Sequence, residues 1–236
     1  MARPPIYNLP MDEPTAKALF SDLTVGQFLD RLSSAEAVPG GGSASAIAAA
    51  LGASLISMVA ALSKGKPKYA VYESTLARCD AVGHELGAEF LRLADRDARA
   101  YAGYSAALKM ARETEEQKLA RQSAIQSAAR AASDAPFDCV KACARLVTAA
   151  ETLAGRSNVN AASDVLVAAF LGEAAARGAA ENVLINLPAT GDEQYADSMR
   201  WRLDRLLHDV AATAARTREI VLSGQSQEPE PEPEPA

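Results

Sequence analysis

One stretch of the sequence combines a carboxylate with two aromatic hydroxyl groups. In the segment DRDARAYAGY, Asp97, Tyr101 and Tyr104 follow one another at intervals of four and three residues, so they share one face of a helix. A carboxylate beside aromatic rings could hold a flat, polar heterocycle. The alternative is a solvated helix face, because the arginines that flank the acid in the sequence are natural partners for it.

A second acidic residue, Asp164, follows a polar turn. Asn158 and Asn160 are typical turn residues, and Asn160 could cap the helix that starts there. Asp164 comes one turn into that helix and is followed by an apolar run. Partial burial would raise the pKa of its carboxyl group and suit it to acid–base chemistry. The alternative is that the acid only complements the positive end of the helix dipole.

Three consecutive glycines, Gly40, Gly41 and Gly42, stand between Pro39 and Ser43. Glycines let a ligand approach the backbone, and the free N–H groups at a helix start can bind an anion or a carbonyl oxygen. The alternative is a tight turn in which Ser43 is the N-cap of the next helix. Three glycines are more than a turn requires, because each adds conformational entropy to the unfolded chain.

Lys66 lies in a basic loop, SKGKPK, that contains glycine and proline. Its ammonium group could hold a carboxylate of a ligand or take part in proton transfer; the alternative is a solvated loop lysine. His84 and His208 have no second ligand at metal-binding spacing, and the three cysteines form no CxxC pair. We therefore expect no metal site, no disulfide and buried thiols.

The elements that position these residues are predicted to be helices. Alanine, the best helix former, dominates the apolar residues, and only 5% of residues are aromatic. No segment shows the alternation typical of strands. Capping boxes, the glycine turn and a proline mark the boundaries. The predicted helices begin after Thr24, at Ser43, near Tyr69, after Thr114 (with a kink or a fresh start at Pro136), near Ala161 and after Thr190.

Charge and the two ends of the chain limit the partners and the location. The net charge is −6, and the run EPEPEPEP supplies four of the acids, so that −2 is left on the remainder. No strong field for nucleic acid or an anionic membrane remains. The N-terminus lacks the order of a signal peptide. We expect a cytoplasmic protein with an N-terminal arm (1–22), one domain (23–223) and a disordered acidic tail (224–236).

The uncharged stretch Ser43–Leu62 has the length of a membrane span. Its larger residues fall in a helical stripe on a background of alanine, glycine and serine. The pattern therefore favours a buried central helix over a membrane span.

Five motifs occur together in an order that one family shares. The chain resembles the cyclodeaminase/cyclohydrolase domain found in formimidoyltransferase-cyclodeaminase and in stand-alone methenyltetrahydrofolate cyclohydrolases, from about residue 23 to 222. The resemblance implies an all-α, antiparallel multi-helix bundle that forms a homodimer and binds a folate in a cleft near the dimer interface. The motifs are PGGGS (39–43), GKPKY (65–69), DRDARAY (95–101), SDVLVAA (163–169) and NVLINL (182–187).

With this resemblance, we assign the catalytic roles to Asp97, Asp164 and Lys66, and prefer Asp97 to the neighbouring Asp95. We expect the two acids to converge beside the glycine turn in one pocket sized for a pterin. No metal or redox cofactor is expected, because the reacting carbon keeps its oxidation level. The expected substrate contacts are Gly40, Gly41, Gly42, Ser43, Tyr101, Asn158, Ser163 and Asn182.

The resemblance implies either of two reactions. A cyclohydrolase hydrolyses 5,10-methenyltetrahydrofolate to 10-formyltetrahydrofolate, and a cyclodeaminase closes 5-formiminotetrahydrofolate and releases ammonia. We expect the cyclohydrolase, because the sequence carries no formimidoyltransferase domain to supply a formimino substrate. A third alternative is a non-catalytic helical protein that binds folate or acts as an adaptor.

Overall fold

Helices make up most of the chain, as its alanine content predicts. The computed structural model describes residues 19–229; residues 1–18 and 230–236, which include most of the predicted arm and tail, lie outside the described residues. No strand occurs between residues 19 and 229, so the all-α prediction is confirmed. In chain order the elements are η1 (Phe20–Asp22), α1 (Val25–Leu32), α2 (Gly41–Ser63), η2 (Pro67–Tyr72), α3 (Glu73–Leu108), α4 (Glu115–Leu153), η3 (Val159–Ala161), α5 (Ala162–Asn186), η4 (Leu187–Thr190) and α6 (Glu193–Ser223).

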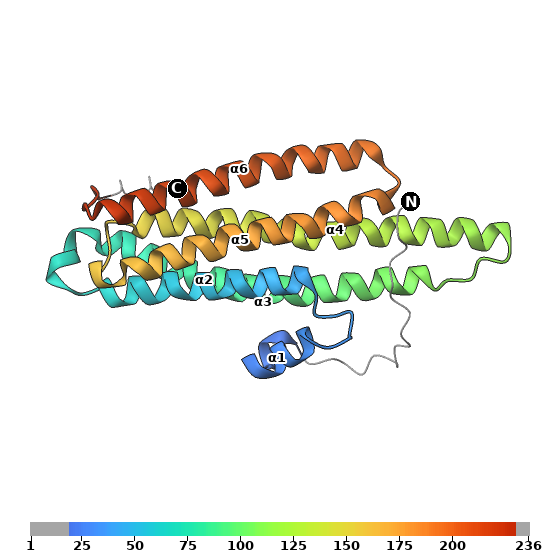
Figure 1. The fold of residues 1–236 in the computed structure, drawn as a ribbon, viewed down its shortest axis with the longest axis horizontal. Coiled ribbons are helices and arrows are strands. Elements are labelled where there is room, and N and C mark those ends of the chain that lie inside the picture. Colours follow the sequence, from blue (N-terminus) through green and yellow to red (C-terminus); the bar gives the residue numbers. More distant parts are fainter. Residues whose placement is uncertain (1–18, 230–236) are drawn as a thin grey trace.

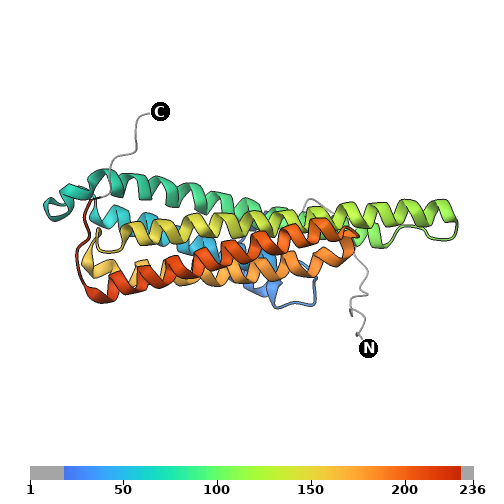
Figure 2. The same ribbon diagram turned by 90° about the horizontal axis from the view of Figure 1, so that it is seen from above.

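Five long helices, α2 to α6, lie lengthwise beside one another, and each runs opposite to the one before it (Figure 1). α2 packs on α3 and α5, α4 packs on α3 and α5, and α6 covers α4 and α5. α3 and α4 extend beyond the other helices as a hairpin at one end of the bundle (Figures 1 and 2). The antiparallel order means that the start of α2 lies beside the end of α5, and the end of α2 beside the start of α5.

Small residues bring the helix backbones close together. Ala49, Ala53 and Ala60 are fully buried on α2. A Cβ atom added to Gly83 of α3 would lie 2.8 Å from the carbonyl oxygen of Ala53, and one added to Gly52 would lie 3.2 Å from that of Ala168 in α5. Real Cβ atoms rarely approach so closely, so α2 meets both neighbours largely through its backbone.

Two of the three predicted capping boxes, those at Thr24 and Thr114, are confirmed. The side chains of Thr24 and Thr114 accept hydrogen bonds from the backbone N–H groups of Gln27 and Gln117, and both glutamines bond back to the cap backbone. Pro136 neither ends nor restarts a helix, because α4 continues through it. All three cysteines are buried, as predicted.

Three cap assignments were wrong. Asn160 does not cap α5, whose N-cap is Ala161; Asn158 instead caps η3, where its side chain accepts from Asn160 N–H. The N-cap of α2 is Gly40 and not Ser43, which lies within the first turn and directs its hydroxyl to α3. The N-cap of α6 is Asp192 and not Thr190; the Asp192 carboxylate accepts from Tyr195 N–H. At α6, Thr190 and Asp192 offer equivalent cap chemistry two positions apart, so local sequence could not decide between them. At α2 the Ser43 hydroxyl bonds Asp97 instead of capping the helix.

The start of the predicted tail is ordered. Residues 224–229 are described without helix, and Gln227 N–H donates to Gly155 O at 3.1 Å. The first residues of the predicted tail therefore contact the α4–α5 turn.

Candidate active site

The carboxylate of Asp97 lies directly against the first turn of α2. Its Oδ2 accepts a hydrogen bond from the Ser43 hydroxyl at 3.0 Å, and the Ser43 backbone N–H also donates to the carboxylate. A Cβ atom on Gly42 would lie 2.6 Å from Asp97 Cγ and 2.7 Å from Oδ2, and closer still to Oδ1. The third glycine of the turn is therefore required by the carboxylate, which fills the space where a side chain would begin.

This environment changes the acidity of Asp97. Burial raises the pKa of its carboxyl group above the ordinary value, and the two hydrogen bonds from Ser43 oppose that rise. The positive end of α2 also faces the carboxylate. The result is an acid that accepts a proton more readily than a solvated aspartate, which suits a general base working near neutral pH.

Asn182, near the end of α5, completes this group of residues. Its amide nitrogen would lie 3.3 Å from a Cβ atom on Gly41, and it donates a hydrogen bond to Gly178 O at 2.8 Å. Gly41 is exposed and Asn182 half-buried, so the group borders the solvent. We call Gly41, Gly42, Ser43, Asp97 and Asn182 the Asp97 cluster.

A second group forms at the other end of α2. The α4–α5 turn (residues 154–161) is fixed there, because Asn158 N–H donates to Ser63 Oγ at 2.8 Å and Val159 N–H donates to Tyr69 Oη at 3.2 Å. The turn leads into exposed Ser163 and half-buried Asp164 in the first turn of α5. The side chain of Asp164 makes no hydrogen bond or ion pair with any residue between 19 and 229.

Exposed Lys66 lies at this same end, in the connection from α2 to η2, and it too has no ion pair among the described residues. We call Lys66, Asn158, Ser163 and Asp164 the Asp164 cluster. Ser63 and Tyr69 hold this cluster together but were not predicted as site residues. Tyr69 belongs to the GKPKY motif, which was a usable signal, whereas nothing in the sequence distinguishes Ser63 from the other serines of α2.

One chain does not bring the two clusters together. α2 has 23 residues, which at 1.5 Å per residue makes it about 34 Å long, and the clusters lie at its opposite ends. The expectation that Asp97 and Asp164 converge beside the glycine turn is therefore not met within a single chain. The reason is the antiparallel course of α2 and α5, which places residue 164 far from residue 41.

The other predicted residues fall as follows. Tyr101 is half-buried one turn after Asp97 on α3, and Gly40 is half-buried as the N-cap of α2. Asp95 has a structural role: its carboxylate accepts from Phe20 N–H at 2.9 Å and so holds η1 against α3. This contact supports the choice of Asp97 over Asp95.

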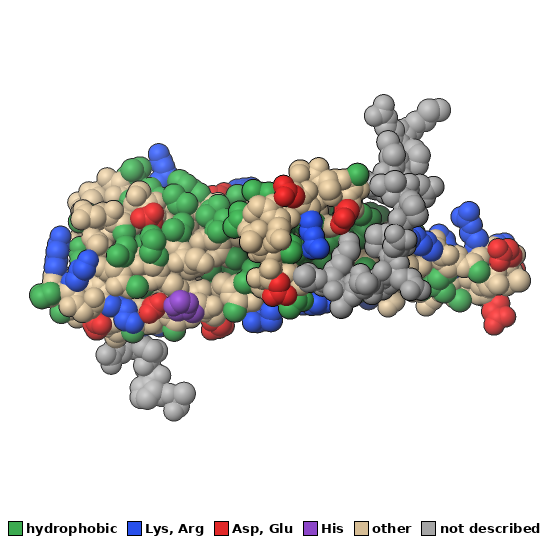
Figure 3. All heavy atoms as spheres, turned by 90° about the horizontal axis from the view of Figure 1, so that it is seen from below, with side chains coloured by type: hydrophobic (Ala, Val, Ile, Leu, Met, Phe, Trp, Pro, Cys, Tyr) green, Lys and Arg blue, Asp and Glu red, His purple; other side chains and the backbone are tan. Residues whose placement is uncertain are grey.

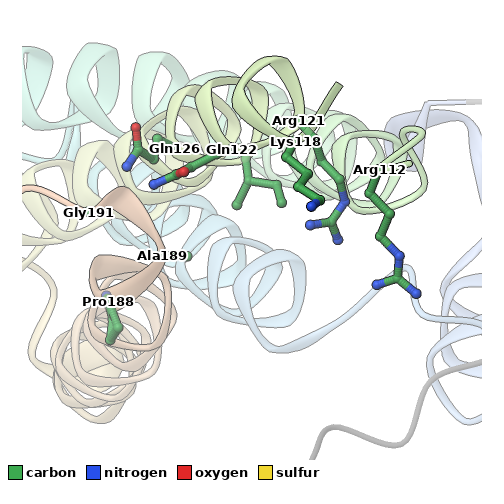
Figure 4. A pocket seen from close by; sticks show the side chains of 9 residues that line it. Arg112, Lys118, Arg121, Gln122, Gln126, Pro188, Ala189 and Gly191 are labelled. Atoms are coloured by element: carbon green, nitrogen blue, oxygen red, sulfur yellow. The ribbon is translucent and has the colours of Figure 1, made fainter. Parts of the chain in front are cut away.

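Open pockets occur elsewhere on the described surface. One, of about 540 Å³, lies between the α3–α4 hairpin and η4, where Arg112, Lys118 and Arg121 face a common space (Figure 4). Another, of about 580 Å³, lies on α3 and α4 and includes Arg92 and Arg145. Neither includes a predicted site residue.

An all-helical antiparallel subunit with these motifs defines one class of protein. Residues 24–205 match the family model described as formiminotransferase-cyclodeaminase, and the chain belongs to this family. It is 35% identical over 200 residues to a methenyltetrahydrofolate cyclohydrolase of Methylorubrum extorquens, an alignment that covers 85% of this chain and 96% of that protein.

Two further relatives show how the domain is used. The chain is 34% identical to the formimidoyltransferase-cyclodeaminase of Rattus norvegicus, with 89% of this chain but only 38% of the rat protein aligned. The crystal structure of a formiminotetrahydrofolate cyclodeaminase from Thermotoga maritima superposes with a TM-score of 0.78 at 27% identity, covering 86% of this chain and 98% of that one. The chain therefore corresponds to one part of the rat protein and to nearly the whole of the two bacterial ones.

Proposed function

We propose that this chain is a methenyltetrahydrofolate cyclohydrolase, which hydrolyses 5,10-methenyltetrahydrofolate to 10-formyltetrahydrofolate. The observation that carries the proposal is the alignment over 96% of a bacterial protein of that name. The buried carboxyl group of Asp97 at the glycine turn supplies suitable chemistry. The reaction moves protons and breaks a carbon–nitrogen bond at an unchanged oxidation level, so we propose that it proceeds without a metal or redox cofactor.

In the proposed mechanism, Asp97 is the general base. The bridge carbon of the substrate is part of a cationic amidinium, which a carboxylate attracts. Water adds to this carbon while one of its protons passes to Asp97. The bond to N5 then breaks as N5 takes up a proton, and the new hydroxyl group loses its proton to become the formyl oxygen, so that one proton is released overall. The formyl group stays on N10. Asp164 orients the ring or protonates N5, and Lys66 assists this proton transfer or binds the glutamate carboxylate of the substrate.

We further propose that the active site forms between two copies of the chain. In a two-fold dimer each surface patch meets its own copy in reverse, so residue i of one subunit contacts residue j of the other, and j contacts i. A two-fold axis crossing α2 near its middle would set the Asp97 cluster of one subunit beside the Asp164 cluster of its partner. Two equivalent sites would result.

An apolar surface in the right place supports this assembly. On the outer side of α2, Leu51, Met58 and Leu62 are exposed by 56%, 38% and 43%, and on neighbouring α5 Val167 and Phe170 are exposed by 45% and 47%. Figure 3 shows hydrophobic side chains gathered on one part of the face that it displays, with charged groups along the opposite edge. Large exposed apolar patches mark interaction surfaces.

By length and composition alone, Gly41–Ser63 and Val159–Thr190 could also cross a membrane, with mean hydropathies of 2.0 and 1.3. We favour a second copy as the occupant of this surface for two reasons. The other faces of both helices form the core of the bundle, and only a protein partner would complete the divided site.

The reaction is tested by following the loss of near-ultraviolet absorbance of 5,10-methenyltetrahydrofolate at a pH low enough to slow its spontaneous hydrolysis. Asp97→Asn and Asp164→Asn should each lower the rate on the order of 10²-fold or more. Near wild-type turnover in both variants would remove the two acids from the mechanism.

The shared site is tested by co-expressing these two inactive variants. Half of the dimers formed at random are mixed, and each mixed dimer has one site with both acids intact, so about a quarter of wild-type activity should return. A co-expressed sample as inactive as its parents would show that both acids do not serve a site made by two subunits. Sedimentation of Leu51→Asp gives a second measurement, because the variant should be monomeric.

The cyclodeaminase reaction is the second candidate, favoured by the names of the rat and Thermotoga maritima relatives. Both reactions pass through a tetrahedral carbon between N5 and N10, so the same residues could serve either. Ammonia release from 5-formiminotetrahydrofolate, without turnover of the methenyl compound, would select it. Folate binding without turnover of either compound would favour a non-catalytic folate-binding protein.

A further inference from the structure

The chain after α6 crosses the end of the bundle and contacts the start of α3 and the α4–α5 turn (Figure 2). Tyr72 Oη donates to Gln227 O at 2.7 Å, Gln227 N–H donates to Gly155 O at 3.1 Å, and Arg156 Nε–H donates to Glu228 O at 2.6 Å. Three hydrogen bonds over two consecutive residues are more than a frayed end would keep.

The turn is shaped to receive this segment. Gly155 has a φ of +70°, and a Cβ atom there would lie 2.6 Å from Gln225 O and 2.8 Å from Gln227 Cγ. Two features therefore require glycine at this position: the left-handed backbone conformation and the close approach of the C-terminal segment. Tyr72 is buried, so its hydroxyl group is held in place by packing as well.

The same turn carries the Asp164 cluster. Two and three residues after Arg156, the N–H groups of Asn158 and Val159 donate to Ser63 and Tyr69 on the inner side of the turn. Residues 225–228 cover its other side. The turn is thus held between the end of α2 and the C-terminal segment, and Asp164 follows directly in the first turn of α5.

We propose that residues 225–228 act as a clamp that positions the α4–α5 turn, and with it Asn158 and Asp164, for catalysis. The clamp residues themselves are positioning groups and do not touch the substrate. The inference rests on the proposed function, since it gives these residues a purpose in the same reaction. The clamp includes only the first residue of the acidic Pro/Glu run, Glu228, and the proposal assigns no role to the rest of that run.

The test compares two truncations, removal of residues 225–236 and removal of residues 230–236. Only the first truncation deletes the clamp, so only the first should lower kcat/KM. The expected decrease is about fivefold or more, because that is the fold-change expected when a hydrogen bond that positions a catalytic group is lost. Tyr72→Phe should have a similar but smaller effect, and it carries the test should the longer truncation fail to fold. Tyr195→Phe is the matched control, because it removes a hydroxyl group bonded to Asp134 at the far end of α6.

A double-mutant cycle separates positioning from general loosening. In the Asp164→Asn background the longer truncation should leave the residual rate nearly unchanged, because the group that the clamp positions is already disabled. An equal loss in both backgrounds would overturn the proposal, as would wild-type kcat/KM in the longer truncation.

Hydrogen–deuterium exchange gives a measurement that does not depend on activity. Amides between residues 154 and 164 should exchange at least roughly tenfold faster in the longer truncation and at the wild-type rate in the shorter one. Should the wild-type chain fail to turn over the methenyl substrate, the proposed function fails and exchange still tests the clamp. Unchanged exchange in both the longer truncation and Tyr72→Phe would refute it.

Discussion

Replacing Gly42 with alanine tests the geometry of the Asp97 cluster with a single methyl group. The added Cβ would lie 2.6 Å from Asp97 Cγ and closer still to Oδ1, whereas ordinary contacts begin at 3.4 Å, so the carboxylate must retreat by at least about 0.8 Å (3.4 minus 2.6). The carboxylate is the end of a flexible side chain and can rotate away. In doing so it loses its hydrogen bonds from Ser43.

The expected cost to stability is small compared with the cost to activity. Losing a charge-assisted hydrogen bond costs about 1.5–3 kcal/mol, and removing a glycine from a helix returns about 0.5–1 kcal/mol. We expect the free energy of unfolding to fall by about 0.5–2.5 kcal/mol. A catalytic group misplaced by about 1 Å can lower the rate on the order of 10²-fold, and we expect kcat/KM of Gly42→Ala to fall by that factor.

The assay is the methenyl absorbance measurement, with urea unfolding in parallel. Gly87→Ala is the matched control, because a Cβ there meets nothing within 4 Å. It should keep wild-type activity and gain about 0.5–1 kcal/mol of stability. A folded Gly42→Ala protein with wild-type kcat/KM would show that the position of the Asp97 carboxylate does not matter for the reaction, and the proposed general base would be wrong.

Three further predictions concern stability. Burial raises the pKa of Asp97 in the folded state. The contribution of Asp97 to folding stability is therefore fully present below about pH 3.9, the unfolded pKa, and is lost as pH rises through the folded pKa. In thermal unfolding scans, the stability of wild type relative to Asp97→Asn should fall from pH 4 toward neutrality. Leu146 is fully buried between Gly52 and Gly172, and Leu146→Ala should cost about 2–5 kcal/mol in urea unfolding. Thr114→Ala removes an exposed capping box and should cost about 1 kcal/mol, with no change in kcat/KM.

Much of the fold followed from local sequence. Thr24 and Thr114 mark two helix starts because a capping box needs only residues three apart. Ser43 shows where this approach fails. Its hydroxyl group has a better partner 54 residues away, in Asp97, and no local rule can anticipate a tertiary contact.

The candidate site was predictable in its residues but not in its arrangement. The five motifs single out Asp97, Asp164 and the glycines, yet their spacing along the chain carries no information on which end of a long helix each will occupy. That depends on the direction of α5 relative to α2. The division into two clusters appears only once the antiparallel bundle has been assembled.

The near-contact of backbones between α2 and α3 has a consequence for rigidity. Where Gly83 meets Ala53, no long side chain intervenes that could change rotamer and let the helices slide. Main-chain atoms, which have almost no freedom to adjust, then set the distance between the axes of α2 and α3. Because Gly42 lies on α2 and Asp97 on α3, the same contact helps to fix Asp97 over Gly42. The α2–α3 interface therefore needs little conformational ordering when substrate binds, but residues larger than glycine and alanine would not fit at Gly83 and Ala53.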